Sequence, residues 1–252
     1  MERKDWVQRR QQAALKLSDD NMYVYKIVRA VLKPCFKLLF RPIVLGQANI
    51  PLQGAAIITA NHRSFWDSAF QAIASPRPIR WMGKSELFKN PLLGRLCVQL
   101  GAFPVQRGKG DDGAIKVAKG LLAQGQLVAL FPEGTRVRQG IGEPKKGAAR
   151  LAIEMGVDTI PMSIVGTERG GLRRALWRRG AQVRLIVHPA IPPIMEATES
   201  KQAASKLMKD QVWPAIKDGV QGLEGHRKQA LAFGAGAALI AGLGIVARKR
   251  KN

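Results

Sequence analysis

The chain has 252 residues, 46% of them hydrophobic and 23% charged, which fits one α/β core with appendages and excludes a disordered or collagen-like protein. Lysine and arginine total 41 against 18 acidic residues, and the resulting net charge of +23 favours an anionic partner such as membrane lipid or nucleic acid. The two cysteines lie in apolar surroundings, which indicates free thiols in a reducing compartment rather than a disulfide framework.

Residues 1–45 predict a basic amphipathic region that associates with a membrane. The first twenty residues are polar and charged and lack an apolar signal core, so we expect no secretory signal and an N-terminus on the side of synthesis. From residue 22, apolar residues recur among lysines and arginines, which predicts amphipathic helices broken near Pro34 and Pro42. Their apolar faces fit either a membrane or the surface of the following domain.

A histidine and an aspartate five residues apart follow the first strand signal. The run 55–60 is short, apolar and partly β-branched, as in a buried strand, so His62 emerges at its C-terminal end. Helical spacing then begins at Phe65, with Ser64 at the expected N-cap. Residues five apart on one helix diverge by about 140°, so the spacing favours a loop histidine whose ring folds back toward Asp67. That carboxylate then fixes the imidazole tautomer and leaves the other nitrogen to take a proton from a hydroxyl.

One alternative for this pair stays open. His62 alone also fits a solvated loop histidine, with Asp67 an acid favoured by the helix dipole. The other two histidines, His188 and His226, have no carboxylate nearby in sequence and fit structural or surface positions. We find no metal-ligand spacing, no Gly-x-Ser-x-Gly elbow and no Walker loop, so we expect no metal site and neither serine nor nucleotide-hydrolysis chemistry.

A second motif, Glu133 to Arg136, follows the apolar run 126–131 and predicts an anion site. Gly134 permits close backbone approach, Thr135 offers a hydroxyl, and Arg136 offers a planar fork suited to phosphate oxygens. Glu133 is expected to hold the arginine or contact the acceptor. Ligands of open α/β sheets gather beyond the carboxyl ends of strands, so this motif and the His62 motif fit one crevice. A solvated turn is the alternative for this motif in isolation.

Two weaker motifs end or interrupt other apolar runs. Residues 101–108 predict a short strand that ends at Arg107, a second candidate phosphate ligand. Residues 157–166 predict a helix-to-strand connection with Pro161 inside an apolar run. A proline there indicates an edge strand or a bulge, either in a purely structural role or as a pocket wall.

Strand and helix signals alternate through the rest of the domain, which predicts an α/β fold with a mixed central sheet flanked by helices. The remaining expected strands are 79–83, 103–105, 127–131, 159–164 and 183–188, and the expected helices are 91–100, 112–124, 147–156 and about 199–217.

Residues 221–252 predict a linker, a Gly/Ala-rich hydrophobic segment at 231–247 and a basic tail, with a loop over 219–228. The hydrophobic segment is at the short limit for a membrane span, and small residues every four positions from Gly234 to Gly242 fit a helix-packing face and self-association. The positive-inside rule keeps the tail cytoplasmic, which conflicts with a complete span next to a cytoplasmic domain. A shallow or re-entrant placement removes the conflict, as does a tail that never inserts.

In this order the motifs resemble those of the glycerolipid acyltransferase family, whose best-known members are the 1-acylglycerol-3-phosphate acyltransferases. The match runs from about Gly46 to Ile191 and places the acyltransferase domain at 46–220, with its glycerolipid acyltransferase fold. It includes Lys84-Ser-Glu-Leu-Phe88 followed by Pro91 and Gly94.

The resemblance implies a role for individual residues. His62 is the general base, Asp67 orients it, and Asn61 supports the turn. The acceptor phosphate is then bound by Arg107, Glu133, Gly134 and Arg136, while Lys84 lies near the active-site mouth and Pro161 belongs to the block for acyl-donor binding.

The implied activity is that of a membrane-associated enzyme that moves a fatty acyl group from an acyl thioester to lysophosphatidic acid and yields phosphatidic acid. The thioester of coenzyme A or acyl carrier protein is a co-substrate, and no cofactor is expected. Gln106 stands where the family often carries an acid, which keeps open another lysophospholipid, glycerol 3-phosphate or a glycolipid as acceptor. A membrane-binding scaffold without turnover is the rival class.

The expected partners are anionic membrane lipid, the lysophospholipid acceptor and the acyl donor, with the catalytic domain on the cytoplasmic face. Nucleic acid is disfavoured, because the pairs Arg173-Arg174 and Arg178-Arg179 lie among Leu172, Leu176 and Trp177, a mixture suited to a lipid headgroup region. A solvated basic surface is the alternative for that stretch.

Overall fold

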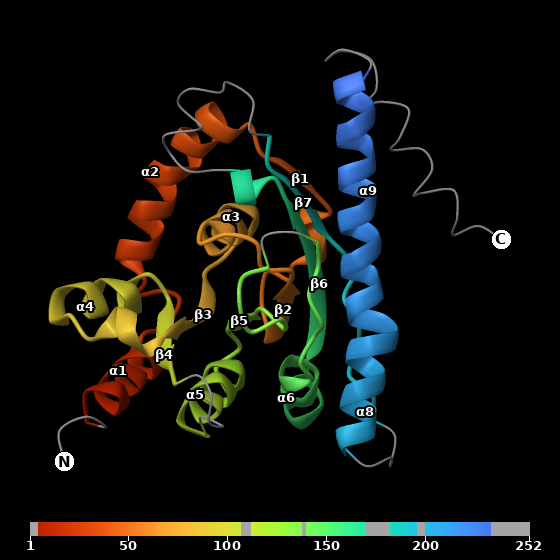
Figure 1. Cartoon of the computed structure of the whole chain (residues 1–252). Coiled ribbons are helices and arrows are strands. Elements are labelled where there is room, and N and C mark those ends of the chain that lie inside the picture. The colour runs from red at the N-terminus through yellow and green to blue at the C-terminus, as the bar shows by residue number, and fades with distance from the viewer. Residues whose placement is uncertain (1–4, 107–111, 138–139, 170–181, 196–199, 233–252) are drawn as a thin grey trace.

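The computed structural model describes residues 5–106, 112–137, 140–169, 182–195 and 200–232 of the chain. Within these residues the centre of the fold is a seven-stranded sheet (Figure 1). Its strands are β1 (Ile43–Leu45), β2 (Ala56–Ala60), β3 (Ile79–Lys84), β4 (Ala102–Val105), β5 (Leu127–Leu130), β6 (Asp158–Val165) and β7 (Arg184–Val187). They lie in the order β1-β7-β6-β2-β5-β3-β4, and all neighbours are parallel except β6 and β7. The predicted mixed sheet is confirmed.

Helices flank this sheet on both faces. The helices are α1 (Asp5–Lys16), α2 (Tyr23–Phe40), α3 (Asp67–Ala74), α4 (Pro91–Gln99), α5 (Asp112–Ala123), α6 (Gly147–Met155), α8 (Ser200–Lys206) and α9 (Trp213–Ala232), with short helical turns η1 (Gln47–Asn49), η2 (Ser85–Phe88) and η3 (Thr167–Arg169) and a π-helical turn η4 (Leu207–Val212). Each strand and helix predicted between residues 55 and 217 is present, with ends shifted by a few residues. Strand β1 and helix α1 have no counterpart among the predicted elements.

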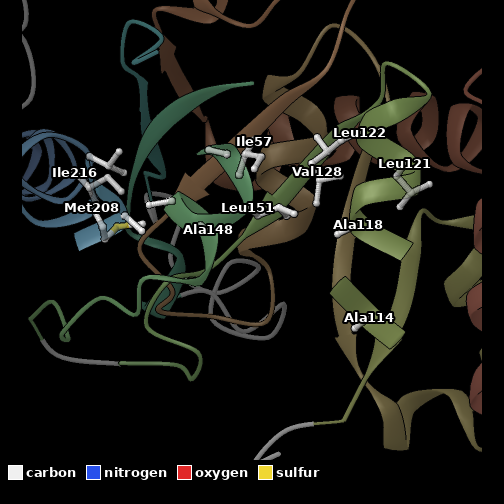
Figure 2. Close-up of a cluster of buried hydrophobic side chains, with 14 of the residues drawn as sticks. Ile57, Ala114, Ala118, Leu121, Leu122, Val128, Ala148, Leu151, Met208 and Ile216 are labelled. Atoms are coloured by element: carbon white, nitrogen blue, oxygen red, sulfur yellow. The ribbon is translucent and has the colours of Figure 1, made fainter. Parts of the chain in front are cut away.

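The two faces of the sheet bury separate apolar clusters, because successive strand residues point to opposite sides. Ile57 and Val128 belong to the cluster beneath α5, α6 and the α8–α9 segment, which Figure 2 shows. Ile58 and Ala129 belong to the other cluster, which includes α2 and α3. The central strands are therefore apolar on both sides, as parallel strands covered on both faces must be.

The N-terminal region is packed into the same domain. The side chain of Gln11 in α1 donates a hydrogen bond to the Pro104 carbonyl of β4. Phe36 of α2 stacks on Phe70 of α3 with ring centroids 4.9 Å apart. Strand β1 pairs with β7, so the boundary expected at residue 45 falls inside the sheet.

Helix α2 continues through Pro34, so the predicted break at that residue is wrong. The helix ends at Phe40, followed by Arg41 in the left-handed conformation (φ 41°) and by Pro42, where the second predicted break is present. Pro34 removes one backbone donor, but Phe36 and Phe40 lie buried after it. Their packing on Phe70 of α3 stabilises the second half of the helix.

Helix α9 runs through residues 219–228, so the predicted loop there is wrong. Glycines lower helix propensity, but Gly219 serves close packing. A Cβ at Gly219 would lie 2.3 Å from Ser163 Oγ and 2.6 Å from His188 Nε2. Only glycine lets α9 approach β6 this closely, and contact with the sheet outweighs the local preference.

Pro161 lies in an interior strand, since β6 is flanked by β7 and β2, so the predicted edge position is wrong. Its carbonyl accepts from the His188 N–H, and Thr159 exchanges both backbone hydrogen bonds with Ile191. The segment after β7 therefore carries one more residue than β6 over this stretch, which is the bulge that the proline predicts. The missing donor of Pro161 faces this irregularity rather than the ladder with β2.

Several predicted features lie outside the described residues. They include Arg107, the basic stretch 173–179, the hydrophobic segment from residue 233 onward and the basic tail. Over the ranges that are described, we find no helix with the length and apolar character that crossing a bilayer requires. Self-association through the 231–247 segment stays a prediction.

Candidate active site

Asn61 fixes the end of β2 against β6. Its side-chain amide donates to the Ile164 carbonyl, and its side-chain oxygen accepts from the Ile164 N–H, both at 2.8 Å. The side chain is almost fully buried. Asn61 thus extends the β2–β6 pairing by one residue and presents His62 at the carboxyl edge of the sheet.

His62 and Asp67 meet at this edge. His62 Nδ1 lies 2.8 Å from Asp67 Oδ2. The backbone N–H groups of Arg63 and Ser64 donate to the same oxygen at 2.7 and 2.8 Å. One carboxylate oxygen therefore holds both the imidazole and the loop that carries it.

Helix α3 begins at Asp67, later than predicted. Trp66 occupies the N-cap, and no side chain caps this helix. Ser64 Oγ accepts from the Trp66 N–H at 3.3 Å, inside the loop, and Phe65 is 64% exposed. The predicted start at Phe65 with a Ser64 cap is wrong, because the Asp67 carboxylate folds back onto the loop and takes its N–H groups.

The segment after β5 holds His62 from the other side. The imidazole stacks on Phe131, with centroids 4.0 Å apart and planes at 17°. The His62 N–H donates to Glu133 Oε1 at 2.7 Å, and the His62 carbonyl accepts from the Val137 N–H at 2.7 Å. Glu133 Oε2 accepts from the Gly142 N–H at 2.9 Å. Both Glu133 oxygens accept from backbone N–H groups, so Glu133 clamps the backbone of the His62 loop. Its expected contact with the arginine of its own motif or with the acceptor stays a prediction.

Burial differs across this cluster. The Asp67 side chain is fully buried, whereas His62 is 12% exposed. Asp67 Oδ1 has no hydrogen-bond partner among the described residues. Burial raises the pKa of Glu133, and the hydrogen bonds from the His62 and Gly142 N–H groups act in the opposite direction. Low solvent access strengthens the interaction between His62 and Asp67. Of the two side chains, only that of His62 reaches solvent.

Gly134 lets a lysine lie over the second motif. Gly134 has φ +71°, and a Cβ there would lie 3.0 Å from Lys145 Nζ and 3.3 Å from its Cε. The Lys145 N–H also donates to the Pro132 carbonyl at 2.9 Å. Thr135 and Arg136 are exposed on the same turn. Lys145 and the arginine therefore place two cations beside one turn.

Lys84 and Arg107 are the other two predicted basic residues, and the described part of the chain shows no hydrogen bond or ion pair between Lys84 and the His62–Asp67 pair. Lys84 ends β3 at the same sheet edge, but its half-exposed ammonium lies 3.1 Å from Glu86 Oε1. The structure does not describe Arg107. Lys145 is not among the predicted site residues, although a lysine pair just before the helix expected at 147 was a signal for it.

Two hollows of about 380 and 570 Å³ open at the opposite edge, where the strands begin. Ala56 and Asp158 line the first, and Arg77 and Gln126 line the second. Neither hollow is lined by His62, Asp67 or Glu133, so both lie away from the candidate active site. Across the described ranges, His, Cys, Asp and Glu side chains form no group of three or more suited to hold a metal ion.

The arrangement can remove a proton from an anionic alcohol. A carboxylate that accepts the Nδ1 proton leaves Nε2 with its lone pair, which is what a general base requires. The cations beside Gly134 favour a substrate with phosphate or carboxylate groups.

Known proteins are similar to this chain in sequence and in fold. A family model described as Acyltransferase matches residues 41–165, a span that holds both motifs. A 1-acyl-sn-glycerol-3-phosphate acyltransferase of Borreliella burgdorferi is 26% identical over 173 residues, which cover 68% of this chain and 69% of that protein. The Bacillus subtilis protein of the same name is 28% identical over 167 residues, 66% of this chain and 82% of its own. The crystal structure of the LPA acyltransferase PlsC from Thermotoga maritima matches with a TM-score of 0.64, 26% identity and 80% coverage of both chains.

Proposed function

Because residues 41–165 match the Acyltransferase family model and the relatives are named as acyltransferases, we propose that the chain moves a fatty acyl group from an acyl thioester to the hydroxyl of lysophosphatidic acid and makes phosphatidic acid in phospholipid synthesis. The observation that carries the chemistry is the 2.8 Å contact between His62 Nδ1 and Asp67 Oδ2. The acceptor follows from the names of the relatives and from the cations beside Gly134.

The reaction needs one base and no covalent acyl-enzyme. His62 Nε2 takes the proton of the acceptor hydroxyl while the hydroxyl oxygen attacks the thioester carbonyl carbon. The imidazolium that forms is stabilised by the Asp67 carboxylate. The tetrahedral oxyanion then collapses, the carbon–sulfur bond breaks, and the proton on Nε2 passes to the departing thiolate. The products are the ester and a free thiol, and His62 returns to its neutral state.

The acceptor phosphate is bound by the cations that lie at the second motif. Arg136 offers a planar fork and Lys145 a point charge, and both lie on or over the turn of Gly134. Lys84 at the end of β3 is a further candidate, and so is Arg107. Thr135 adds a hydroxyl. Glu133 takes part indirectly, through the His62 backbone.

The acyl donor is a thioester of coenzyme A or acyl carrier protein, which acts as a co-substrate. No bound cofactor enters the mechanism. The net charge of +23 suits both donors, since each is anionic.

Membrane association is part of the proposal, because the acceptor is a lipid. Helix α2 turns apolar side chains to solvent at helical spacing, and α4, which lies on the same side of the molecule away from α9 (Figure 1), adds exposed leucines. These side chains are Tyr23 (65% exposed), Ile27 (64%), Val31 (59%), Leu38 (80%) and, on α4, Leu92 (78%). Lys26, Lys33 and Lys37 on α2 add positive charge, which suits an anionic headgroup layer. We infer that this surface binds the cytoplasmic leaflet.

Vesicle sedimentation tests the membrane surface. Purified protein is mixed with vesicles of phosphatidylglycerol and phosphatidylcholine, and the bound fraction is measured for the wild type, Leu38→Asp and Leu52→Asp. We expect at least about tenfold weaker binding by Leu38→Asp, since a leucine buried in the acyl boundary contributes about 1.5 to 3 kcal/mol. Leu52 is 74% exposed in the turn before β2, so Leu52→Asp should bind like the wild type. Equal effects of the two substitutions would contradict the surface.

Product analysis tests the reaction. Wild-type and His62→Ala proteins in detergent are incubated with an acyl thioester and lysophosphatidic acid, and phosphatidic acid is measured by mass spectrometry. We expect product from the wild type and at least a roughly hundredfold lower rate from His62→Ala. Transfer to glycerol 3-phosphate or another lysophospholipid instead would keep the mechanism and change the acceptor. Lack of transfer to any acceptor, with either donor, would favour a non-catalytic scaffold.

A further inference from the structure

Arg63 is a buried charge next to the proposed base, and the mechanism above does not use it. Its side chain is 4% exposed. Nη1 lies 2.7 Å from Glu224 Oε1 on α9 and 4.0 Å from Glu168 Oε2 on η3. Nη2 donates to the Gly140 carbonyl at 3.0 Å. Three segments that are distant in sequence therefore converge on this one guanidinium.

The backbone of Arg63 belongs to the histidine loop. Its N–H donates to Asp67 Oδ2 at 2.7 Å, the oxygen that also contacts His62 Nδ1. A buried charge has to stay with its partners, because leaving it unpaired away from water is costly. The position of the guanidinium thus constrains the position of the Arg63 backbone N–H. Because this N–H binds Asp67 Oδ2, it also constrains the oxygen that orients the imidazole.

Helix α9 is itself fixed against the sheet. Gly219 packs directly on Ser163 and His188, and the Ser163 hydroxyl donates to the Ile216 carbonyl of α9 at 2.9 Å. His188 Nε2 lies 2.8 Å from the same hydroxyl. Five residues further along the helix, a rise of about 7.5 Å, Glu224 reaches Arg63. Figure 1 shows α9 running along the sheet on the side of β6.

We propose that Arg63 is a positioning residue of the acyl-transfer site and that Glu224 of α9 is its anchor. The C-terminal helix thereby holds the His62–Asp67 loop in its reactive geometry. The inference rests on the proposed function for its kinetic readout, but the loop geometry can be measured without turnover.

Kinetics of four variants test the anchor. Glu224→Gln, Arg63→Lys, Arg63→Met and the double variant Arg63→Met/Glu224→Gln are compared with the wild type, after unfolding curves confirm that each is folded. We expect kcat to fall about 100-fold in Arg63→Met, to be partly restored in Arg63→Lys and to fall several-fold in Glu224→Gln, because small misplacement of a reacting group is sufficient for such losses. Acceptor KM should stay within about twofold. In the Arg63→Met background, Glu224→Gln should have no further effect.

Glu154→Gln is the matched control. Glu154 also pairs with an arginine, Arg150, at 2.6 Å, but on α6. This control should keep wild-type kcat. Equal loss in Glu154→Gln and Glu224→Gln, a wild-type kcat in folded Glu224→Gln, or additive effects in the double variant would overturn the proposal.

Hydrogen exchange supplies the readout that does not need activity. Peptides spanning residues 61–67 should exchange faster in Glu224→Gln than in the wild type or in Glu154→Gln, since a loop without its anchor opens more often and then exposes the His62 and Arg63 N–H groups to solvent. If the wild type transfers no acyl group, the proposed function fails while this difference still decides the anchor. Unchanged exchange in Glu224→Gln would count against the anchor even in an active enzyme.

Discussion

Asp67 Oδ2 lies 2.8 Å from His62 Nδ1, and the same oxygen receives the N–H groups of Arg63 and Ser64. Orientation of the imidazole and closure of its loop are therefore one interaction. A change at Asp67 affects both functions, and suitable substitutions can separate them.

Asp67→Asn keeps a side-chain oxygen for the loop N–H groups but removes the charge that stabilises an imidazolium. We expect kcat to fall by about 10² to 10⁴ with little change in thermal stability. Asp67→Ala also removes the acceptor of the loop N–H groups, and we expect its free energy of unfolding to be lower by about 1 to 3 kcal/mol. Steady-state kinetics and urea unfolding of both variants give the comparison. An Asp67→Asn enzyme with more than a tenth of the wild-type kcat would exclude the orienting role.

Lys145 and Lys146 offer a matched pair, because they are adjacent, equally charged and both exposed, while Lys145 alone is found over Gly134. We expect Lys145→Met to raise the KM for lysophosphatidic acid about tenfold, through one lost charge-assisted contact. Lys146→Met should change it by less than about twofold. Monoacylglycerol, which lacks the phosphate, should show no difference between the variants. Equal effects of both lysines would point to general electrostatic attraction instead.

Gly219 and Gly222 test the packing of α9. A Cβ at Gly219 meets Ser163 Oγ at 2.3 Å, whereas at Gly222 nothing lies within 4 Å. We therefore expect Gly219→Ala to lower the free energy of unfolding by about 1 to 3 kcal/mol. Gly222→Ala should raise it by up to about 1 kcal/mol, since alanine is the better helix former. Urea unfolding measures both, and a stabilised Gly219→Ala variant would contradict the close approach.

His188 predicts a loss of stability in acid. Burial lowers its pKa from 6.5 to about 4, with Asp218 acting in the opposite direction. Below about pH 6.5 the unfolded chain takes up a proton at His188 that the folded chain does not take up until about pH 4. The free energy of unfolding should therefore decrease as the pH falls through this window, by up to about 3 kcal/mol from this residue.

Urea unfolding between pH 7.5 and 4.5 compares the wild type with His188→Gln, which cannot titrate. The stability of the variant should depend less on pH across the window. If the free energy of unfolding of both proteins changed equally with pH, His188 would not contribute to the pH dependence.

Short sequence patterns predicted those strands and contacts that depend on residues close together in the chain. Apolar, partly β-branched runs identified β2 and β5 because a strand covered on both faces needs such residues. The spacing of His62 and Asp67 was sufficient to predict their contact, since the two lie in one short loop. The loop expected over 219–228 was wrong because packing of Gly219 on Ser163 is invisible to local propensity.

The sequence by itself determined the mixed α/β class, the pairing of His62 with Asp67 and the presence of a cationic motif, because each depends on neighbouring residues. Only the tertiary structure decided that Glu133 holds the His62 backbone from 71 residues away and that Glu224 reaches Arg63 across 161 residues. Contacts between distant segments depend on how the helices and the sheet pack, and the residue types that make them also occur on solvated surfaces.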